Sequence, residues 1–311
     1  MARIGLVQVD GKWANLALMR LSAYHKAKGD QVEWYNPLFP SDVVYASKTF
    51  VTTPDDAYLP ADCIRGGTGY DLTTVLPDEV ESCFPDYSLY PSMDYAIGLT
   101  TRGCVRNCSF CFVPRKEGKL RIVGDLYDFW NGQQKQKVIL LDNNLTAAPM
   151  AHFEKIINQL AKERVLVDFS QGLDIRLLTE DHARLLKTVR FKYVHFAWDS
   201  MGYEKAVRRG VEMLTRYIHP QRLTFYVLVG YDTTEAEDMY RIETLRRLNV
   251  NPFVMAFDKR DRYQAALARW CNHKAIFKTV SWRDYQSGKR KTKGQSEIFD
   301  SHDRPPCRCG L

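Results

Sequence analysis

The stretch Leu99–Pro114 reads LTTRGCVRNCSFCFVP and places Cys104, Cys108 and Cys111 with three and then two residues between them. Thiolates suit iron–sulfur clusters, and three cysteines this close together can bind three corners of a cubane. The fourth iron then has no cysteine from this stretch, and an open coordination position is what a catalytic metal centre needs. A zinc site and an electron-transfer cluster stay open as alternatives, although both usually take a fourth cysteine or histidine.

The composition is typical of a globular protein from a reducing compartment. The 311 residues are 45% hydrophobic and 26% charged, and no run of about eighteen apolar residues predicts a membrane helix. Met1–Gly11 lacks the pattern of a secretion signal, so we expect a cytoplasmic protein with no membrane partner. Much of the net charge of +7 lies late, in a tail with Lys289, Arg290, Lys291 and Lys293, which favours a solvated segment over a nucleic-acid partner.

From about Tyr95 onward, strand and helix patterns alternate regularly. Six such repeats favour a partial (β/α) barrel over a closed eightfold one, with functional side chains after the carboxyl ends of the strands. The expected strands are Ala96–Thr100, Val138–Asp142, Val165–Phe169, Tyr193–Trp198, Leu223–Gly230 and Pro252–Phe257. The expected helices are Leu126–Gln133, Pro149–Lys162, Thr179–Lys187, Tyr203–Tyr217, Glu235–Leu248 and Arg262–Trp270.

A smaller region of short strands around one helix precedes this repeat. Strands are expected at Arg3–Val9, Gln31–Tyr35 and Asp42–Ala46, and a helix capped by Asn15 is expected to end near Gly29. This order predicts a small, Rossmann-like α/β domain ahead of the partial barrel. The expected division is 1–92 for this domain, 93–280 for the barrel and 281–311 for a basic C-terminal tail.

The cysteine spacing, with the aromatic Phe110 directly before the third cysteine, resembles the signature of the radical S-adenosylmethionine (SAM) superfamily. The resemblance implies that Cys104, Cys108 and Cys111 bind a [4Fe–4S] cluster and that Phe110 lies against the adenine of SAM. It also implies that the reduced cluster cleaves SAM to a 5′-deoxyadenosyl radical, which abstracts hydrogen from a substrate. An electron donor such as a flavodoxin or a ferredoxin is then required.

Polar residues after the later strands are the SAM contacts that this resemblance implies. Asp142, Asn143 and Asn144 follow the second strand, where the family often carries a Gly-Gly-Glu that contacts the SAM amino group, and their oxygens can accept hydrogen bonds from an ammonium. The other expected contacts are Gln171, Arg176, Asp199, Gly230 and Met255. Among them, Arg176 would pair with the SAM carboxylate and Asp199 would bond the ribose hydroxyls.

Residues 1–92 resemble a shortened form of the cobalamin-binding domain that precedes many radical SAM barrels. The Asp-x-His-x-x-Gly loop that supplies the axial histidine is missing, so cobalamin is not expected and the domain is expected to serve as a lid or substrate wall. The expected substrate is a small molecule that can be enclosed, with a flat, nucleobase-like ring. The candidate substrate contacts are Asp10, Trp13, Tyr70, Trp198 and Tyr231.

The compact build resembles radical SAM enzymes such as a lyase for the 7-deazaguanine base queuine, so a lyase or rearrangement reaction is favoured. A methylthiotransferase or methyltransferase acting on RNA or protein, and a non-enzymatic iron–sulfur protein, stay as alternatives. His195 is expected to be a hydrogen-bonded core residue. Cys63, Cys83 and Cys271 are expected to be structural, whereas Cys307 and Cys309 could hold a second cluster or have no function.

Overall fold

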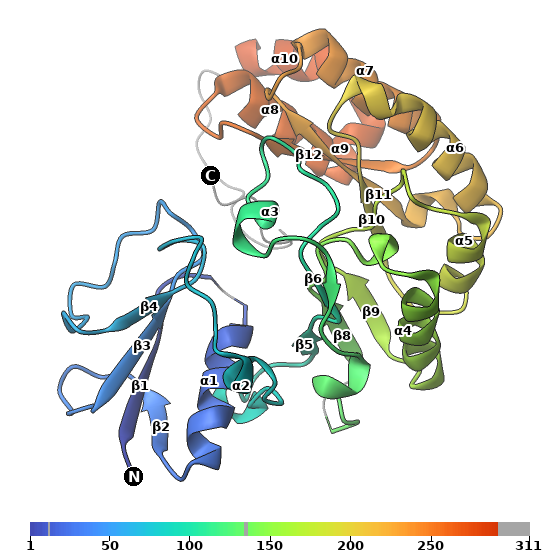
Figure 1. The fold of residues 1–311 in the computed structure, drawn as a ribbon. Coiled ribbons are helices and arrows are strands. Elements are labelled where there is room, and N and C mark those ends of the chain that lie inside the picture. The colour runs from blue at the N-terminus through green and yellow to red at the C-terminus, as the bar shows by residue number, and fades with distance from the viewer. Residues whose placement is uncertain (12, 134–135, 292–311) are drawn as a thin grey trace. The chain divides into compact units, whose positions relative to one another are not determined.

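The computed structural model of the chain describes residues 1–291 apart from residue 12 and residues 134–135 (Figure 1). The chain divides into two compact units. One contains Met1–Gln171 and Thr188–Lys192, and the other contains Gly172–Lys187 and the described residues from Tyr193 onward. Both are α/β structures with parallel sheets, which confirms the predicted fold class. The expected domain boundary at residue 92 falls inside the first unit and stays a prediction.

The first sheet has four parallel strands in the order β2-β1-β3-β4, and helix α1 connects β1 to β2. Their bounds are β1 (Arg3–Gln8), β2 (Gln31–Trp34), β3 (Val43–Ser47), β4 (Ile64–Gly66) and α1 (Leu16–Ala27). The chain goes to β2 on one side of β1 and then to β3 on the other, so the strand order reverses beside β1. Apolar side chains of β1 and α1 form one buried cluster. The predicted Rossmann-like arrangement is therefore present.

The second sheet of the first unit contains three parallel strands in the order β5-β8-β9. Their bounds are β5 (Ala96–Gly98), β8 (Lys137–Leu140) and β9 (Leu166–Phe169). Helix α4 (Met150–Lys162) runs between β8 and β9 and buries Phe153, Ile156 and Leu160. Because parallel strands end at the same edge, the residues after β5, β8 and β9 meet at one edge of this sheet.

The second unit contains the parallel strands of the last three predicted repeats, in the order β10-β11-β12. Their bounds are β10 (Val194–Ala197), β11 (Leu223–Val229) and β12 (Asn251–Ala256). The predicted helices are α5 (Glu180–Leu186), α6 (Glu204–Thr215), α7 (Glu235–Arg247) and α8 (Arg262–Asn272). Figure 1 shows α6, α7 and α8 on one face of this sheet. All residues of β11 are buried, which explains the continuous apolar run that predicted it.

One predicted helix is wrong. The segment Leu126–Gln133 forms only a single 3-10 turn over Leu126–Asp128. Leu126, Phe129 and Trp130 are all buried, so the apolar spacing of a helix is present for one turn. The chain then leaves the helical conformation, because Gly132 has a φ of +82°. Apolar spacing over a single turn does not distinguish a turn from a helix.

The C-terminal region contains two further helices, α9 (Lys274–Thr279) and α10 (Trp282–Lys291). The Trp282 ring contacts the rings of Tyr263 and Trp270, which attaches α10 to α8. The segment expected as a tail therefore begins as a helix, while Lys293, Cys307 and Cys309 lie outside the described residues. In the part of the chain that the structure describes, no helix combines the length and apolar character needed to cross a membrane.

Candidate functional site

The three cysteines lie on a loop that is closed at its base by a short antiparallel ladder. Strand β6 (Thr101–Arg102) pairs with β7 (Arg121–Ile122), and helix α3 (Val113–Lys116) follows the third cysteine. Within the loop, the Cys111 amide donates to the Cys108 carbonyl at 3.0 Å. The loop follows β5, so the cysteines stand at the carboxyl end of the first barrel-type strand, as predicted.

The residue before the first cysteine must be glycine. Gly103 has a φ of +75°, and a Cβ at this position would lie 2.4 Å from the Lys119 carbonyl oxygen. The Cys104 amide donates to the Gly118 carbonyl at 3.2 Å, which brings the two ends of the loop together. The backbone therefore holds Cys104 in a defined position.

The Glu117 carboxylate joins both ends of the cysteine loop to the end of β8. It accepts hydrogen bonds from the Gly103 amide at 3.0 Å, from Arg102 Nη1 at 3.0 Å and from Asn143 Nδ2 at 2.6 Å. Arg102 also donates to Glu81 through Nε and Nη2, at 3.0 and 2.6 Å. These partly buried, charge-assisted bonds fix the base of the loop.

The Cys104 sulfur accepts two hydrogen bonds. The Arg106 amide lies 3.4 Å and the Asn144 side-chain nitrogen 3.6 Å from Cys104 Sγ. Asn144 Oδ1 accepts a bond from the Thr146 hydroxyl at 3.0 Å, which fixes the orientation of the amide. Donors directed at a cysteine sulfur tune the reduction potential of a cluster bound to it.

The Asp142 carboxylate ties the end of β8 to the end of β5. It is 4% exposed and accepts bonds from the hydroxyls of Thr100 and Thr101 at 2.7 Å and from both of their amides. Burial raises the pKa of Asp142, and these bonds oppose the rise. Below it, the buried His152 Nε2 lies 3.1 Å from the Thr100 hydroxyl. These contacts give Asp142 a structural role, and its expected contact with SAM stays untested.

The donor set of the loop fits an iron–sulfur cubane, because three thiols on one short loop are soft ligands that suit iron–sulfur sites. A [4Fe–4S] cluster takes each cysteine on a different iron, so its ligands need not meet at one point. Cys104, Cys108 and Cys111 are partly exposed cysteines on one closed loop. The loop can therefore present three separate ligands while its base stays fixed.

The predicted SAM contacts are divided between the two units. Phe110 is half-buried between two of the cysteines, and Gln171 is half-buried just after β9 in the same unit. Asn143 and Asn144 are brought to the cysteine loop by their bonds to Glu117 and Cys104. Arg176, Asp199, Gly230 and Met255 belong to the second unit. Their expected contacts with SAM stay a prediction.

Two of the second-unit residues already have partners there. The Arg176 Nε and Nη2 atoms donate to the Asp174 carboxylate at 2.7 and 3.0 Å, and the guanidinium stacks over the Tyr203 ring. This is the bidentate geometry that the sequence assigned to a SAM carboxylate, with Asp174 as the partner. Asp199 Oδ1 accepts the Leu228 amide at 3.1 Å, and burial raises the pKa of Asp199.

Gly230 is required by a neighbouring side chain. It has a φ of +76°, and a Cβ there would lie 2.1 Å from the amide nitrogen of Gln264. Gln264 Oε1 in turn accepts the Asp258 amide at 2.9 Å. The Gln264 side chain therefore explains why residue 230 is a glycine, without any contact with an adenine.

The expected role of Trp198 in substrate stacking is wrong. Its side chain is 0% exposed, and its indole N–H donates to the Ser200 carbonyl at 2.9 Å, so it is a core residue. A tryptophan at a strand end has the same sequence pattern whether it faces the core or a ligand. Tyr231, by contrast, is partly exposed and its ring contacts that of Phe257 at 4.8 Å between centroids.

A buried ion pair that the sequence does not reveal connects the ends of β10 and β11. Asp238 and Arg241 are 1% and 0% exposed. Arg241 donates to the Trp198 carbonyl at 2.6 Å and to the Leu228 carbonyl at 2.8 Å, and Asp238 accepts the Gly230 amide at 3.2 Å. An Asp and an Arg three residues apart on a charged helix are indistinguishable from a surface pair in the sequence. Glu117 and His152 were missed because their partners lie 14 to 52 residues away in the chain.

In the Rossmann-like sheet, two expected substrate contacts have structural roles. The Asp10 carboxylate accepts the amides of Thr49 and Phe50 at 2.8 and 2.7 Å, which ties the end of β1 to the segment after β3. The Tyr70 ring lies under the Lys48 ammonium at 4.2 Å. Burial raises the pKa of Tyr70 to about 12. Their expected contacts with a substrate stay untested.

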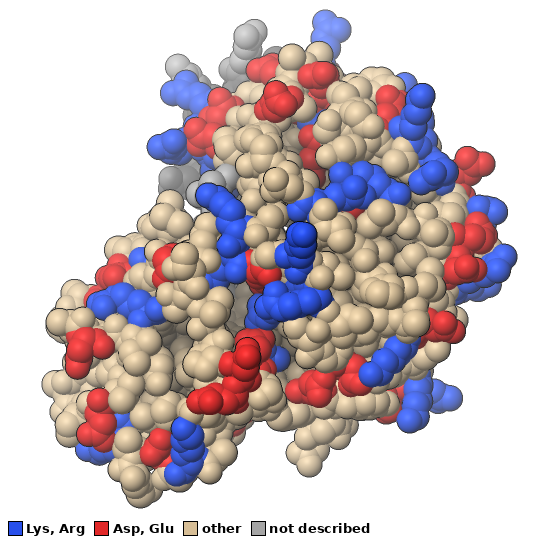
Figure 2. Space-filling model, in the orientation of Figure 1, with Lys and Arg blue, Asp and Glu red and all other residues tan. Residues whose placement is uncertain are grey.

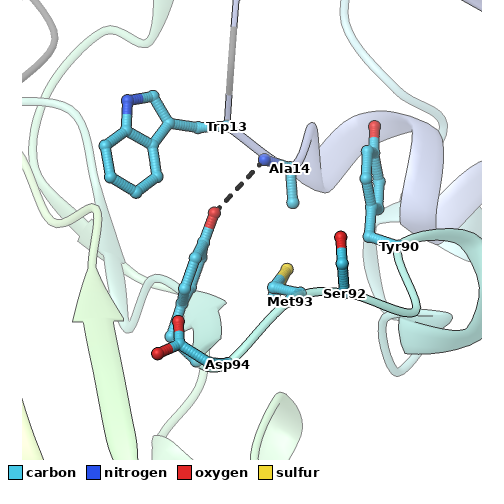
Figure 3. Close-up of a pocket in the computed structure, with 7 residues that line it drawn as sticks. Trp13, Ala14, Tyr90, Ser92, Met93 and Asp94 are labelled. Atoms are coloured by element: carbon cyan, nitrogen blue, oxygen red, sulfur yellow. Dashed lines mark hydrogen bonds between the residues drawn. The ribbon is translucent and has the colours of Figure 1, made fainter. Parts of the chain in front are cut away.

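Trp13 lines a pocket of about 190 Å³ at the start of α1 (Figure 3). Figure 3 shows Trp13 and Tyr90 on opposite sides of it, with Ser92 and Met93 between them. The other lining residues are Ala14, Asp94 and Tyr95. The Tyr90 hydroxyl accepts the Asn15 amide at 3.1 Å and the Tyr95 hydroxyl accepts the Ala14 amide at 3.3 Å. The phenols of the pocket walls are thus bonded to the backbone at the start of the helix.

The fold defined by these units is an α/β fold with a partial, barrel-like set of parallel strands after a small Rossmann-like sheet. It is shared with a solved radical SAM methyltransferase, TsrM from Kitasatospora setae, whose structure has cobalamin and a [4Fe–4S] cluster bound. The alignment covers 82% of this chain and 72% of that chain, with a TM-score of 0.63 and 12% sequence identity. No protein-family model matches the chain, and no curated protein matches it.

Proposed function

We propose that this protein is a radical SAM enzyme in which Cys104, Cys108 and Cys111 hold a [4Fe–4S] cluster. The observation that carries the proposal is the closed loop after β5, which presents three partly exposed thiols and directs two N–H donors at Cys104. The shared fold with a radical SAM methyltransferase supports it. When bound, the cluster would supply one electron for the reductive cleavage of SAM to methionine and a 5′-deoxyadenosyl radical.

The residues of the chain then position the two cofactors. Glu117 and Asp142 fix the two ends of the loop to the strands. Asn143 and Asn144, whose side chains already reach the loop, are the best placed to contact the SAM amino group. The assignments of Phe110 to the adenine and of Asp199 to the ribose are part of this proposal.

For the substrate, we propose a small, nucleobase-like molecule, and for the reaction, a lyase or rearrangement that starts with hydrogen abstraction. Trp13, Tyr70 and Tyr231 are the expected aromatic contacts with exposed surface, so they remain candidates for stacking on a flat ring. A methyl transfer reaction is the second candidate, because the fold is that of a methyltransferase. Cobalamin separates the two, since the proposal expects none to bind.

The test is to prepare the protein without oxygen, reconstitute it with iron and sulfide, and add SAM and dithionite. The proposal expects about four irons per chain and the formation of 5′-deoxyadenosine and methionine in equal amounts. Bound zinc, or an intact cluster with no 5′-deoxyadenosine formed, would contradict it. Adding hydroxocobalamin to the same preparation tests the second candidate, because a methyltransferase of the TsrM kind would retain it through gel filtration.

A further inference from the structure

The pocket at the start of α1 combines aromatic rings with one carboxylate. Trp13, Tyr90 and Tyr95 supply the rings, and Asp94 is the one charged side chain among the described residues that line it. Its volume of about 190 Å³ is below the roughly 300 Å³ at which pockets for drug-sized ligands begin, so it fits a small head group. We call this cavity, lined by the residues drawn in Figure 3, the aromatic pocket.

The hydroxyls of the two tyrosines already bind the protein itself. Tyr90 Oη accepts the Asn15 amide at 3.1 Å and donates to Gln8 Oε1 at 2.6 Å. Tyr95 Oη accepts the Ala14 amide at 3.3 Å. These two amides are therefore not available to an anion, and the tyrosines offer a ligand their rings more than their hydroxyls.

The aromatic rings are ordered by contacts with one another. The Tyr95 ring packs edge-on against Trp13, with 5.8 Å between centroids, and the Tyr90 ring packs edge-on against Trp34, with 5.4 Å between centroids. Trp13 and Tyr90 lie on opposite sides of the aromatic pocket (Figure 3). A ligand that enters between them meets rings that are already in place, which lowers the entropic cost of binding.

The charge of the aromatic pocket is negative. Asp94 is exposed and makes no hydrogen bond or ion pair with the described residues. Burial raises the pKa of Tyr95, and the charge of Asp94 adds to the rise, so the carboxylate acts on the ring beside it. On the face of the molecule in Figure 2, acidic and basic side chains are interspersed over the first sheet. No broad field of one sign covers that face, and local groups decide which ligand a pocket takes.

One ring of the aromatic pocket already interacts with a cation of the chain. Lys137 Nζ lies 5.4 Å from the centroid of the Tyr95 ring, within the reach of about 6 Å of a cation–π interaction. Lys137 is not among the described residues that line the pocket. The rings of Trp13 and Tyr90 therefore remain for a cation from outside the chain.

We propose that the aromatic pocket binds a small molecule through a quaternary, methylated ammonium group, held by the rings of Trp13 and Tyr90 and by the carboxylate of Asp94. Such a group has no N–H donor to satisfy, which suits a wall whose tyrosine hydroxyls are occupied, and aromatic rings attract it through their negative faces. A neutral flat ring would gain nothing from the carboxylate charge. The inference goes beyond the proposed function and requires neither the cluster nor SAM.

The first test compares choline with its neutral carbon analogue, in which a carbon atom replaces the nitrogen. The two probes have the same shape and the same methyl groups, so a difference between them reports the charge alone. Binding to the full-length protein is measured by saturation-transfer NMR on the methyl protons. Choline should bind at least about tenfold more tightly than the analogue. Equal affinities, or no binding of choline, would overturn the proposal.

The second test removes one ring at a time. Trp13→Leu takes a ring from the aromatic pocket and should weaken choline binding by about fivefold or more. Trp34→Leu is the matched control, because Trp13 and Trp34 are both 42% exposed and Trp34 does not line the pocket. The control should bind choline within about twofold of the wild type. Equal losses in the two variants would place the cation elsewhere and contradict the proposal.

The third test removes the charge and leaves the rings. Asp94→Asn should weaken choline binding by about threefold to fivefold at low salt, less at high salt, and should not change binding of the neutral analogue. Asp62→Asn removes an exposed carboxylate outside the pocket and serves as the control. If both variants bind choline equally, the carboxylate has no part in the site, and the proposal fails on that point.

Two further ligands identify what the aromatic pocket takes. Adenine is the probe for a neutral flat ring, and tighter binding of adenine than of choline, lost in Trp13→Leu, would overturn the proposal in favour of stacking. A short peptide that contains trimethyllysine carries the same head group as choline. Tighter binding of the peptide would support the proposed chemistry and make a protein side chain its source, whereas tighter binding of choline would support a free small molecule.

Discussion

Two strand ends in the first unit are held in opposite ways. After β5 the chain leaves the sheet as a long loop, and its fixed contacts lie at the base, where the carboxylates of Glu117 and Asp142 accept bonds from both ends. After β1 the chain turns within a few residues into α1. There, Asn15 caps the helix, and the hydroxyls of Tyr90 and Tyr95 accept the preceding amides.

The difference shows which of the two ends is available to a ligand. The place where the strand order reverses is the usual ligand position in an open α/β sheet, and helix N-termini bind phosphate through unpaired amides. In this chain, Asn15 accepts the Leu18 amide of the first helical turn, and Tyr90 and Tyr95 accept the two amides just before the helix. The end of β5 instead presents partly exposed thiols on a braced loop. This contrast supports chemistry at β5 and a wall-like role for the first sheet.

The largest expected effect is at the end of β5, where the cysteine loop begins. Cys108→Ala removes one of the three proposed ligands, so we expect loss of the brown cluster absorbance and of SAM cleavage. Cys83→Ala is the matched control, because Cys83 is a partly exposed cysteine outside the loop. Iron content and 5′-deoxyadenosine are measured for both. If the Cys108→Ala protein retains the cluster absorbance or SAM cleavage, the end of β5 would not differ from the end of β1 in the way proposed.

The second-largest effect is expected at Asp142, whose hydrogen bonds hold the base of the cysteine loop. Asp142→Asn replaces a carboxylate oxygen with an NH₂ group that faces the donors of Thr100 and Thr101, so the free energy of unfolding should fall by about 2–3 kcal/mol. Asp94→Asn is the same change at an exposed residue and should stay within about 0.5 kcal/mol. Urea unfolding of the metal-free proteins measures both. Equal stabilities would mean that Asp142 does not hold the loop, which would favour its direct contact with SAM.

Substitutions at the end of β1 should change the free energy of unfolding less. Tyr90→Phe removes the acceptor of the Asn15 amide and the donor to Gln8 Oε1, and should lower the free energy of unfolding by about 1 kcal/mol. Tyr95→Phe removes one longer bond, to the Ala14 amide, and should cost less. Urea unfolding gives the stabilities. Gel filtration with hydroxocobalamin tests the contrast itself, because binding by the wild type would show that the phenols do not close this end.

The features that the sequence predicts correctly share a physical cause. Strand β11 is apolar because both of its faces are covered, so the continuous run Leu223–Gly230 locates it within one residue. The place of the cysteine loop is predicted because the three cysteines are close together in the chain and directly follow the apolar strand β5. In both cases the pattern and the interaction lie in the same short segment.

The features that the sequence does not predict depend on partners far along the chain. The hydrogen bonds that Asp142 accepts are not predicted, because Thr100 and Thr101 lie about forty residues earlier in the chain. Trp198 reads as a stacking residue until its burial is known. Arg241 reads as a surface residue until the carbonyls that it binds are placed. Local spacing carries no information about such long-range satisfaction of polar groups.

The smallest expected effect is the pH dependence of the free energy of unfolding that comes from His152, at the base of the cysteine loop. Burial lowers the pKa of His152 in the folded protein, so the unfolded chain binds the proton more readily. The stabilising contribution is therefore complete above the ordinary imidazole pKa and is lost as the pH falls through it toward the lower folded value. The free energy of unfolding should decrease below about pH 6.5, by at most about 1.4 kcal/mol per pH unit for this group.

His152→Gln should remove part of this slope while keeping a donor for the Thr100 hydroxyl. Burial also lowers the pKa of His182, so the double variant with His182→Gln should be flatter still. Urea unfolding of the metal-free proteins between pH 5 and 8 measures the slopes. If His152→Gln leaves the slope unchanged, the proton is not excluded from the site under Thr100. The base of the cysteine loop would then be accessible to solvent, as the cysteine thiols are. The difference between a buried loop base and partly exposed thiols would not hold.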